Sequence, residues 1–134
     1  MRWCARTSLR RRTGCARLNL DPGARVRHLT CIHLADGQPY QFEDRWINLK
    51  ASPAARTADF RASGPNEWLV RQVPFSSVEI SFSAAAASEE QAQHLGCAAG
   101  DPLFLVERQT TWQEQAVTFV RLLYHRGHRM TTRY

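Results

Sequence analysis

Two stretches of this chain repeat the same order of features at a constant offset of 77 residues, counted from Leu18 to Leu95. Residues 18–29 (LNLDPGARVRHL) and 95–106 (LGCAAGDPLFLV) each place a leucine, then a glycine, then an extended apolar run. A second extended segment follows each copy, at residues 38–49 and 115–126. The repeated unit is therefore predicted to be a helix, a strand, a turn and a second strand. Two such units can pair about a pseudo-twofold axis and leave a ligand cleft between them.

Charge is distributed unevenly along the 134 residues. The first 17 positions hold six arginines and neither Asp nor Glu, whereas the rest of the chain holds 12 basic (18 − 6 = 12) and 12 acidic residues. The net charge of +6 therefore comes from the N-terminus. We expect a solvated basic tail over residues 1–14 and one folded domain over residues 15–134. Because the tail accounts for the basic excess, composition does not favour a nucleic-acid-binding surface on the folded part.

Cysteine usage and hydropathy narrow the class of protein further. The four cysteines show no CxxC spacing and no paired histidine at ligand distance, so neither a zinc site nor a redox pair is expected. We expect no metal and no cofactor. Apolar runs are only as long as strands, and no apolar segment follows the N-terminal arginines as it would in a secretion signal. We therefore expect a soluble cytoplasmic protein with no contact to a membrane.

Turn residues and hydrophobic periods predict strands and short helices. One hairpin is expected over residues 25–34 and 38–49, and a second at the repeat offset. The segment 77–84 alternates apolar residues (Val78, Ile80 and Phe82) with mainly polar ones, which predicts a strand with one buried face. Short helices are expected over residues 13–20, 51–60 with Pro53 in the first turn, 67–73, and 88–95 with Ser88 as N-cap and Gly96 or Gly100 at its end.

The turn of the first hairpin decides which side chains share a face. A two-residue turn at Asp36 and Gly37 places His33 opposite Tyr40, whereas a three-residue loop that also includes Ala35 places it opposite Pro39. Only the three-residue loop puts His33 on the same face as the polar side chains of the next strand, because residues two apart point the same way. Those side chains are Gln41, Glu43 and Arg45, and the offset of 77 adds a facing set of Arg108, Thr110, Thr118, Leu122 and Tyr124.

Four segments of the sequence resemble a known family. They are residues 33–49 (HLADGQPYQFEDRWINL), 65–84 (PNEWLVRQVPFSSVEISFSA), 95–112 (LGCAAGDPLFLVERQTTW) and 116–134 (AVTFVRLLYHRGHRMTTRY). Together they resemble the UTRA effector domain of GntR-type transcriptional repressors of the HutC subfamily, from about Ala16 to the C-terminus. The resemblance implies an α+β fold like that of chorismate lyase, an antiparallel sheet with flanking short helices and one duplicated half.

The resemblance also implies a function without covalent chemistry. Such a domain binds a metabolite, for this subfamily urocanate or a related small intermediate, and thereby controls operator binding by a repressor of histidine utilisation. The family places a winged helix-turn-helix before this domain, and the residues that precede it here are too few to form one. DNA contact is therefore expected only through a winged-helix domain outside this chain, and a homodimer is expected. Whether the chain is a truncated piece, a gene fragment or a free-standing domain stays open.

Residue by residue, the resemblance implies an effector-binding set and no catalytic residue. It points to Cys31, His33 and Glu43 on the first hairpin, Asn66 and Trp68 at a helix start, and Thr118 and Tyr124 on the last strand, to which the facing set adds Arg45 and Arg108. Sugar-responsive members carry arginines where Cys31 and His33 stand, which disfavours a sugar phosphate. Urocanate needs a stacking wall, an acceptor for its ring N–H and a donor for its carboxylate. The expected wall is Trp68 or Tyr124, the acceptor Glu43, and the donor Arg108 or His33.

Each candidate also has a purely structural interpretation. Glu43 could pair with Arg45, Arg108 with Glu79 or Glu107, Trp68 could belong to the core, and His33 could be a surface residue. Arg121 is expected on the opposite face from Thr118. Two other functions stay open: an enzyme of the chorismate lyase type, since a pocket with Arg and Glu could accept an anionic aromatic substrate, and a dimerisation module without a ligand. No Cys–His or Ser–His–Asp grouping supports the enzyme.

Overall fold

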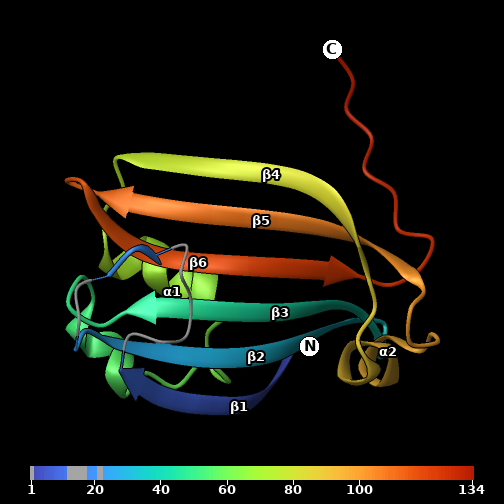
Figure 1. The fold of residues 1–134 in the computed structure, drawn as a ribbon, viewed down its shortest axis with the longest axis horizontal. Coiled ribbons are helices and arrows are strands. Elements are labelled where there is room, and N and C mark those ends of the chain that lie inside the picture. The colour runs from blue at the N-terminus through green and yellow to red at the C-terminus, as the bar shows by residue number, and fades with distance from the viewer. Residues whose placement is uncertain (1, 12–17, 21–22) are drawn as a thin grey trace.

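The computed structural model describes the backbone of residues 2–11 and both backbone and side chains of residues 18–20 and 23–134. These residues form a six-stranded antiparallel sheet with the strand order β1-β2-β3-β6-β5-β4 (Figure 1). The strands are β1 (Arg2–Arg11), β2 (Arg25–Ala35), β3 (Gln38–Asn48), β4 (Ser77–Ala86), β5 (Pro102–Trp112) and β6 (Gln115–Tyr124). The predicted α+β class and both predicted hairpins are confirmed.

The described residues also form three short helices. They are the 3-10 helix η2 (Pro53–Arg56), α1 (Pro65–Gln72) and α2 (Glu89–Leu95). The helix expected over residues 51–60 is therefore shorter than predicted, although Pro53 does begin it. Most of the helix expected over residues 13–20 lies outside the described residues. No helix in the described part of the chain is long and apolar enough to cross a membrane.

The prediction of a solvated tail over residues 1–14 is wrong for Arg2–Arg11. This segment forms β1 and pairs antiparallel with β2, from Arg2 opposite His33 to Arg11 opposite Arg25. Trp3, Ala5 and Leu9 alternate with arginines, and this period of two is typical of a strand. The prediction of a tail rested on the number of charges and did not take this alternation into account. The backbone ladder with β2 thus extends the sheet into the basic segment.

Both hairpins turn through two residues, which corrects the predicted three-residue loop. Asp36 and Gly37 have φ angles of 50° and 76°, as a tight primed turn requires. The register then shifts between His33 and Leu34, which are opposite Gln41 and Pro39, so Tyr40 is an extra residue in β3. This bulge restores the face sharing of His33 and Gln41 that the sequence argument had attributed to a longer loop.

The second hairpin repeats this irregularity at the predicted offset. Thr111 pairs with Ala116 and Thr110 with Thr118, so Val117 is the extra residue, 77 positions after Tyr40. In the centre of the sheet, Asp44 of β3 lies opposite Arg121 of β6, again 77 positions apart. The strand order and this register are those that a twofold arrangement of the hairpins needs, and the pseudo-twofold relation itself stays a prediction.

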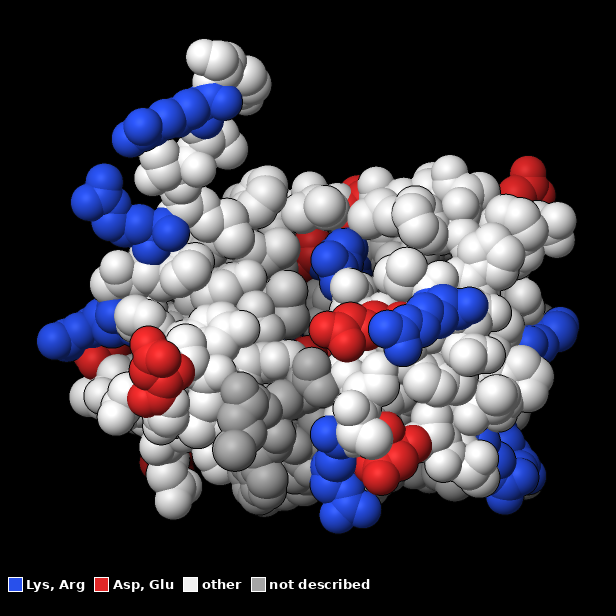
Figure 2. All heavy atoms as spheres, turned by 180° about the vertical axis from the view of Figure 1, so that it is seen from behind, with Lys and Arg blue, Asp and Glu red and all other residues white. Residues whose placement is uncertain are grey.

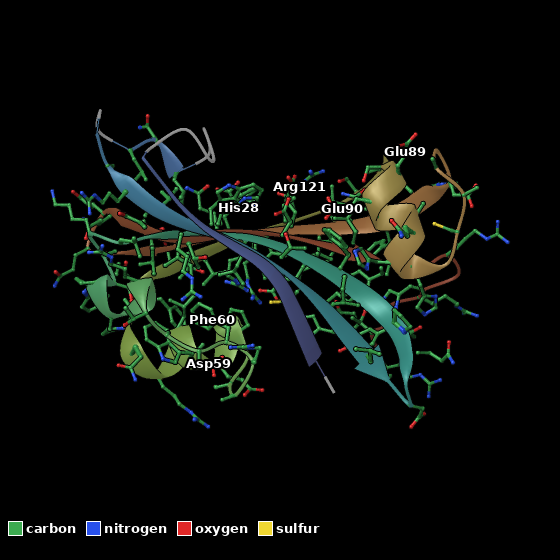
Figure 3. The ribbon with its side chains drawn as sticks, turned by 90° about the horizontal axis from the view of Figure 1, so that it is seen from below. His28, Asp59, Phe60, Glu89, Glu90 and Arg121 are labelled. Atoms are coloured by element: carbon green, nitrogen blue, oxygen red, sulfur yellow. The ribbon has the colours of Figure 1, made fainter. Side chains whose placement is uncertain are left out.

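The two faces of the sheet are covered by different helices. Figure 3 shows the sheet edge-on, with α2 on one side and with η2 and α1 on the other. Beneath η2 and α1, Phe60 and Leu69 pack with Leu29 and Ile47 of the sheet. Beneath α2, the buried residues include Ala92, Leu95, Phe42 and Leu123. Each face therefore has its own small core, and these cores set which side chains remain available for a site.

The predicted buried face of β4 is wrong, although the strand itself is confirmed. Val78, Ile80 and Phe82 are 38%, 49% and 61% exposed. An edge strand has a neighbour on one side only, and the helices that cover the sheet leave this row uncovered. Alternation in the sequence marked one apolar face correctly, but it carried no information on whether that face would be covered.

The start and end of α2 follow the prediction. The Ser88 hydroxyl accepts a hydrogen bond from the N–H of Gln91 (3.1 Å), and the Gln91 side chain accepts one from the N–H of Ser88 (2.9 Å). Gly96 ends the helix in the left-handed region, with φ of 71°. This reciprocal capping box satisfies two N–H groups of the first turn that have no partner within the helix.

Replacement of Ser88 by alanine is expected to lower the free energy of unfolding by about 1 kcal/mol, because the first turn of α2 loses its acceptor. Urea denaturation measures the effect. Ser88→Asp serves as a matched control that keeps an acceptor oxygen and should retain most of the stability. Equal midpoints for the Ala variant and the unchanged protein would show that this cap is dispensable.

Candidate functional site

Two adjoining cavities lie on the face of the sheet that carries α1. We call the first the polar cavity, with a volume of about 310 Å³. We call the second the apolar groove, also of about 310 Å³. The polar cavity is lined by His33, Tyr40, Gln41, Glu43, Arg45, Gly64, Pro65, Asn66, Glu67, Arg108 and Leu122. The apolar groove is lined by Asn66, Leu69, Val70, Val73, Phe75, Val78, Ile80, Arg108, Thr110, Val117 and Thr118.

The strand register explains why distant residues meet at the polar cavity. His33 of β2 lies opposite Gln41 of β3, which lies opposite Tyr124 of β6. Arg45 of β3 and Arg108 of β5 lie opposite the same residue, Val120 of β6. Because residues directly opposite in a sheet project to the same side, these strands present one continuous polar face toward α1. The predicted sharing of one face is confirmed.

Glu43 and Arg45 form a buried ion pair at the bottom of the polar cavity. Their side chains are 3% and 1% exposed, and Arg45 Nε donates to Glu43 Oε2 at 2.5 Å. The other carboxylate oxygen, Oε1, lies 2.7 Å from His33 Nε2. Glu43 therefore has a structural role, as the alternative of a pair with Arg45 predicted. It holds Arg45 and His33 in place, and both of its carboxylate oxygens already have partners.

Arg45 connects this pair to the last strand. Its Nη1 donates to the hydroxyl of Thr118 at 3.2 Å, and that hydroxyl donates to the carbonyl of Trp46 at 2.8 Å. Thr118 is 4% exposed and lines the apolar groove rather than the polar cavity. The Thr118 hydroxyl therefore holds the guanidinium of Arg45 in place from the side of the apolar groove.

The environment of Glu43 changes its acidity. Burial by itself raises the pKa of this carboxyl group, but the guanidinium of Arg45 and the hydrogen bonds from His33 and Arg45 outweigh burial and lower the pKa to about 2. Glu43 therefore stays ionised across the physiological range. A carboxylate with so low a pKa is a weak general base, since proton acceptance is most efficient when the pKa lies near the working pH.

Acid is expected to destabilise the protein through Glu43. The folded pKa of about 2 lies below the ordinary value of 4.5, so the stabilisation is complete above pH 4.5 and is lost as the pH falls toward 2. Urea denaturation at pH 6, 4 and 3 should show a decline in unfolding free energy that is smaller in Glu43→Gln. Identical pH dependence in the two proteins would contradict the assignment.

Arg108 forms part of the wall between the two cavities. Its Nη2 donates to Oδ1 of Asn66 in the first turn of α1 at 2.6 Å. Burial lowers the pKa of Arg108, and the positive charge of Arg45 lowers it further, against the opposing effect of Glu43. Neither expected carboxylate partner is the one observed, and Glu107 instead pairs with Arg121 (3.4 Å). The guanidinium of Arg108 thus lies between a second cation and a neutral amide.

The N-terminal end of α1 adds partial positive charge to the polar cavity. Gly64 is the N-cap and supplies no side-chain hydrogen bond, and Pro65 occupies the first turn. Both line the cavity together with Asn66 and the exposed Glu67. Because the N–H groups of a helix start carry partial positive charge, this end favours an anion.

Four of the residues implied by the resemblance do not line the polar cavity. Trp68 packs edge-on against Phe60, with ring centroids 5.6 Å apart, as part of the core beneath α1. Cys31 is fully buried and disulfide-bonded, which also corrects the expectation that no cysteine would take part in a redox pair. The backbone register places Cys31 opposite Cys4. Thr118, as described above, is the third, and Tyr124 is the fourth.

Tyr124 lies next to Gln41 but lines neither cavity, and its ring is not an open stacking wall. Its ring stacks on His128 with centroids 4.0 Å apart and also lies 5.9 Å from Phe104. Burial raises the pKa of Tyr124, while a hydrogen bond with Gln41 lowers it. His128 was not predicted from the sequence, because only the fold of the segment after β6 brings it onto the ring of Tyr124.

Tyr40, Gly64 and Pro65 are further cavity residues that sequence reasoning missed. Tyr40 lines the cavity because it is the bulged residue of β3, and no signal in a single sequence located that bulge. Pro65 could have been found from its place at a helix start, where proline is favoured. Among the described residues, no group of three or more His, Cys, Asp or Glu side chains is arranged to hold a metal ion.

Arg121 lies where the sequence predicted it. Figure 3 shows Arg121 and His28 on the α2 side of the sheet, opposite Phe60 and Asp59. Its partner is Glu107, on that same side. Arg121 therefore cannot reach the polar cavity and offers a matched arginine for experiments on Arg108.

The geometry defines the class of protein first. An antiparallel sheet with short helices on both faces, and with a cavity lined by two arginines against a helix start, is a small α+β domain with a candidate ligand site. The profile of the UTRA domain matches residues 9–131. The chain therefore belongs to the UTRA domain family.

Relatives and solved structures agree with this assignment. The chain is 33% identical over 119 residues to the histidine utilization repressor of Pseudomonas putida, a match that covers 87% of this chain and 48% of that protein. The C-terminal domain of the histidine utilization repressor from Pseudomonas syringae pv. tomato str. DC3000 superposes with a TM-score of 0.88 at 28% identity, covering 100% and 99% of the two chains. A GntR-family transcriptional regulator from Enterococcus faecalis V583 shares the fold, with a TM-score of 0.83 at 17% identity. The chain spans about half the length of the curated relatives it matches.

Proposed function

We propose that this chain is the effector-sensing and dimerisation domain of a cytoplasmic GntR-type transcriptional repressor of the HutC subfamily. In this proposal a small anionic metabolite binds in the polar cavity and controls DNA binding by a winged-helix domain outside this chain. The observation that carries the proposal is the pair of guanidinium groups, Arg45 and Arg108, that line one cavity in which Glu43 is the one buried carboxylate. Because the second carboxylate of the lining, Glu67, is exposed to solvent, the buried part of the cavity holds two cations against one anion, which favours an anionic ligand.

In this proposal the carboxylate of the effector lies between Arg108 and the start of α1. Asn66 now occupies one N–H of Arg108, and an ionised carboxylate makes a stronger, charge-assisted hydrogen bond than this amide. An incoming carboxylate would therefore replace Asn66 as the partner of Arg108. The N–H groups at the helix start would add to its binding.

A flat imidazole ring suits the remainder of the polar cavity. His33, Tyr40 and Gln41 line the end away from Arg108 and offer two rings and an amide. The volume of about 310 Å³ is at the small end of ligand pockets, which matches a compact metabolite. The similarity to histidine utilization repressors supports urocanate or another metabolite of histidine degradation as the effector.

Calorimetry and thermal melting with urocanate test the proposal. Ligand at about one hundred times its dissociation constant should stabilise the domain by roughly 2.7 kcal/mol, which is readily seen as a higher melting temperature. Histidine and a sugar phosphate serve as comparison ligands. No heat and no melting shift with urocanate up to millimolar concentration would rule out this effector, and a response to the sugar phosphate alone would reassign the ligand class.

An enzyme of the chorismate lyase type is the second candidate, because the same cavity could accept an anionic aromatic substrate. The environment of Glu43 argues against it, since both oxygens are engaged and the pKa is about 2. We therefore propose that the domain carries out no covalent chemistry. Incubation with chorismate at high protein concentration should yield no product, and formation of 4-hydroxybenzoate and pyruvate would reverse this proposal.

A further inference from the structure

The first part of the chain carries the positive charge of the molecule. Residues 1–35 hold eight arginines and one acidic residue, Asp21, which gives a net charge of +7 (8 − 1 = 7). Residues 36–134 hold ten basic and eleven acidic residues, a net charge of −1 (10 − 11 = −1). Because Arg2–Arg11 form β1, much of this excess belongs to the sheet and not to a tail outside it. The reason for excluding a nucleic-acid-binding surface on the folded part therefore no longer holds.

This charge lies along one border of the sheet. β1 pairs with β2 on one side, and among the described residues it is the first strand in the order (Figure 1). Its ten residues include four arginines that recur from one end of the strand to the other: Arg2, Arg6, Arg10 and Arg11. In an antiparallel ladder every second residue turns its N–H and C=O toward the next strand, so half of the peptide groups of β1 face no described strand. The border therefore combines cationic residues with backbone N–H donors.

Exposed cations continue this border where β2 begins. The register places Arg11 opposite Arg25. The N–H of Leu49 donates to the carbonyl of Arg25 at 3.1 Å, and the next residue is Lys50. Arg25 and Lys50 are exposed, and neither forms an ion pair with a residue that the structure describes. Figure 2, which shows the α1 face, has blue side chains at its lower right, the end of the sheet where β2 begins. We call β1 together with Arg25 and Lys50 the basic border.

The neighbouring strand offers no carboxylate to neutralise these charges. Residues 25–35 contain neither Asp nor Glu, and Asp44 of β3 is already bonded to His28 at 2.5 Å. Arg27 of β2 has a structural role instead, because its Nη1 donates to two backbone carbonyls in the segment 55–58, at 2.8 and 2.7 Å. We therefore leave Arg27 out of the basic border. A run of cations without anions between them favours a polyanion as partner.

We propose that the basic border binds the phosphate backbone of duplex DNA. The proposal rests on the proposed function, in which DNA is the polyanion that the repressor meets, and it adds a contact made by this domain itself. A strand of ten residues extends about 33 Å, close to the length of about 34 Å of one turn of B-DNA. Arginine side chains and backbone N–H groups both donate to phosphate oxygens. Such contacts add affinity without reading the base sequence.

Fluorescence anisotropy with a labelled duplex of about two helical turns tests the proposal. The chain is assayed by itself, so the winged-helix domain of the proposed repressor takes no part. About four phosphate contacts predict that the logarithm of the binding constant falls with the logarithm of the salt concentration at a slope of about −3.6. The affinity should therefore drop roughly 100-fold between about 50 and 200 mM salt, and a duplex of unrelated sequence should bind equally well.

Paired substitutions test which cations make the contact. Arg6→Ser with Arg10→Ser should make the slope shallower by about 1.8, because two phosphate contacts are lost. Arg71→Ser with Arg129→Ser is the matched control, since both arginines are exposed, lie outside β1 and β2, and carry the same total charge. The control should keep the slope. Arg6→Lys with Arg10→Lys should keep it as well, because lysine binds phosphate as a point charge.

Hydrogen exchange locates the contact without any variant. Amides of β1 should exchange more slowly when DNA is added, and amides of β4 at the opposite border should not change. Absence of binding at about 50 mM salt, an equal loss of slope in the control, or protection of β4 in place of β1 would overturn the proposal. Tighter binding of polyglutamate than of DNA would also overturn it, since that result indicates an acidic protein segment as the partner.

Urocanate calorimetry on the same samples separates this proposal from the proposed function. DNA binding without heat from urocanate rejects only the sensor. Heat from urocanate without DNA binding rejects only the basic border.

Discussion

Arg45→Met is expected to lower the free energy of unfolding by about 3–5 kcal/mol. Arg45 is 1% exposed and is bonded to Glu43 and Thr118, so its removal leaves the carboxylate of Glu43 buried without its main partner. The cost comes mostly from that unpaired charge. Urea denaturation of the variant measures it.

A double-mutant cycle distinguishes the unpaired charge from a loss of packing. The double variant Glu43→Leu, Arg45→Met should be more stable than the sum of the two single losses indicates, because no uncompensated charge remains. Arg61→Met is a control in which an exposed arginine loses an ion pair with Asp59, and it should change stability by less than about 0.5 kcal/mol. Additive losses in the cycle would mean that the pair does not act as a unit.

Arg108→Met is expected to weaken urocanate binding by about 10- to 100-fold, which corresponds to the loss of one charged hydrogen-bonding partner. The stability of the ligand-free domain should change little, because the variant loses the bond to Asn66 but also removes a cation that lies near Arg45. Calorimetry measures the affinity, and the melting temperature without ligand checks the fold.

Arg121→Met is the control for this change. Arg121 is an arginine of β6, the strand next to that of Arg108, but it lies on the α2 side of the sheet and pairs with Glu107. Its replacement should leave the affinity unaltered. If both variants bind as the unchanged protein does, the polar cavity is not where the carboxylate binds, even if urocanate is the effector.

Local sequence signals predicted most elements of the fold. Branched and aromatic residues around a turn predicted both hairpins, and Ser88 with Gly96 predicted the limits of α2. The offset of 77 held down to the bulges at Tyr40 and Val117. The hairpins and the limits of α2 depend on interactions between residues close in sequence, and therefore a single sequence contains them, whereas the bulges became visible only in the structure.

The candidate site was predictable only in part. Alternation along β2, β3 and β5 brought His33, Glu43, Arg45 and Arg108 to one cavity, with Asn66 across from them, as expected. The roles inside the cavity were not predictable. That Glu43 is fully engaged, that Trp68 belongs to the core and that His128 covers Tyr124 all depend on distances between separate elements.

The sequence by itself determined the order of the elements, the face on which each strand residue lies, and the family to which the whole belongs. These follow from backbone period and turn chemistry, which act over a few residues. Tertiary structure alone decided which faces are covered: it placed the basic segment 2–11 in the sheet, left the apolar row of β4 exposed, and buried Arg45 beside Glu43. The physical reason is that burial is a property of neighbours distant in sequence, and a periodic pattern marks an apolar face without specifying what covers it.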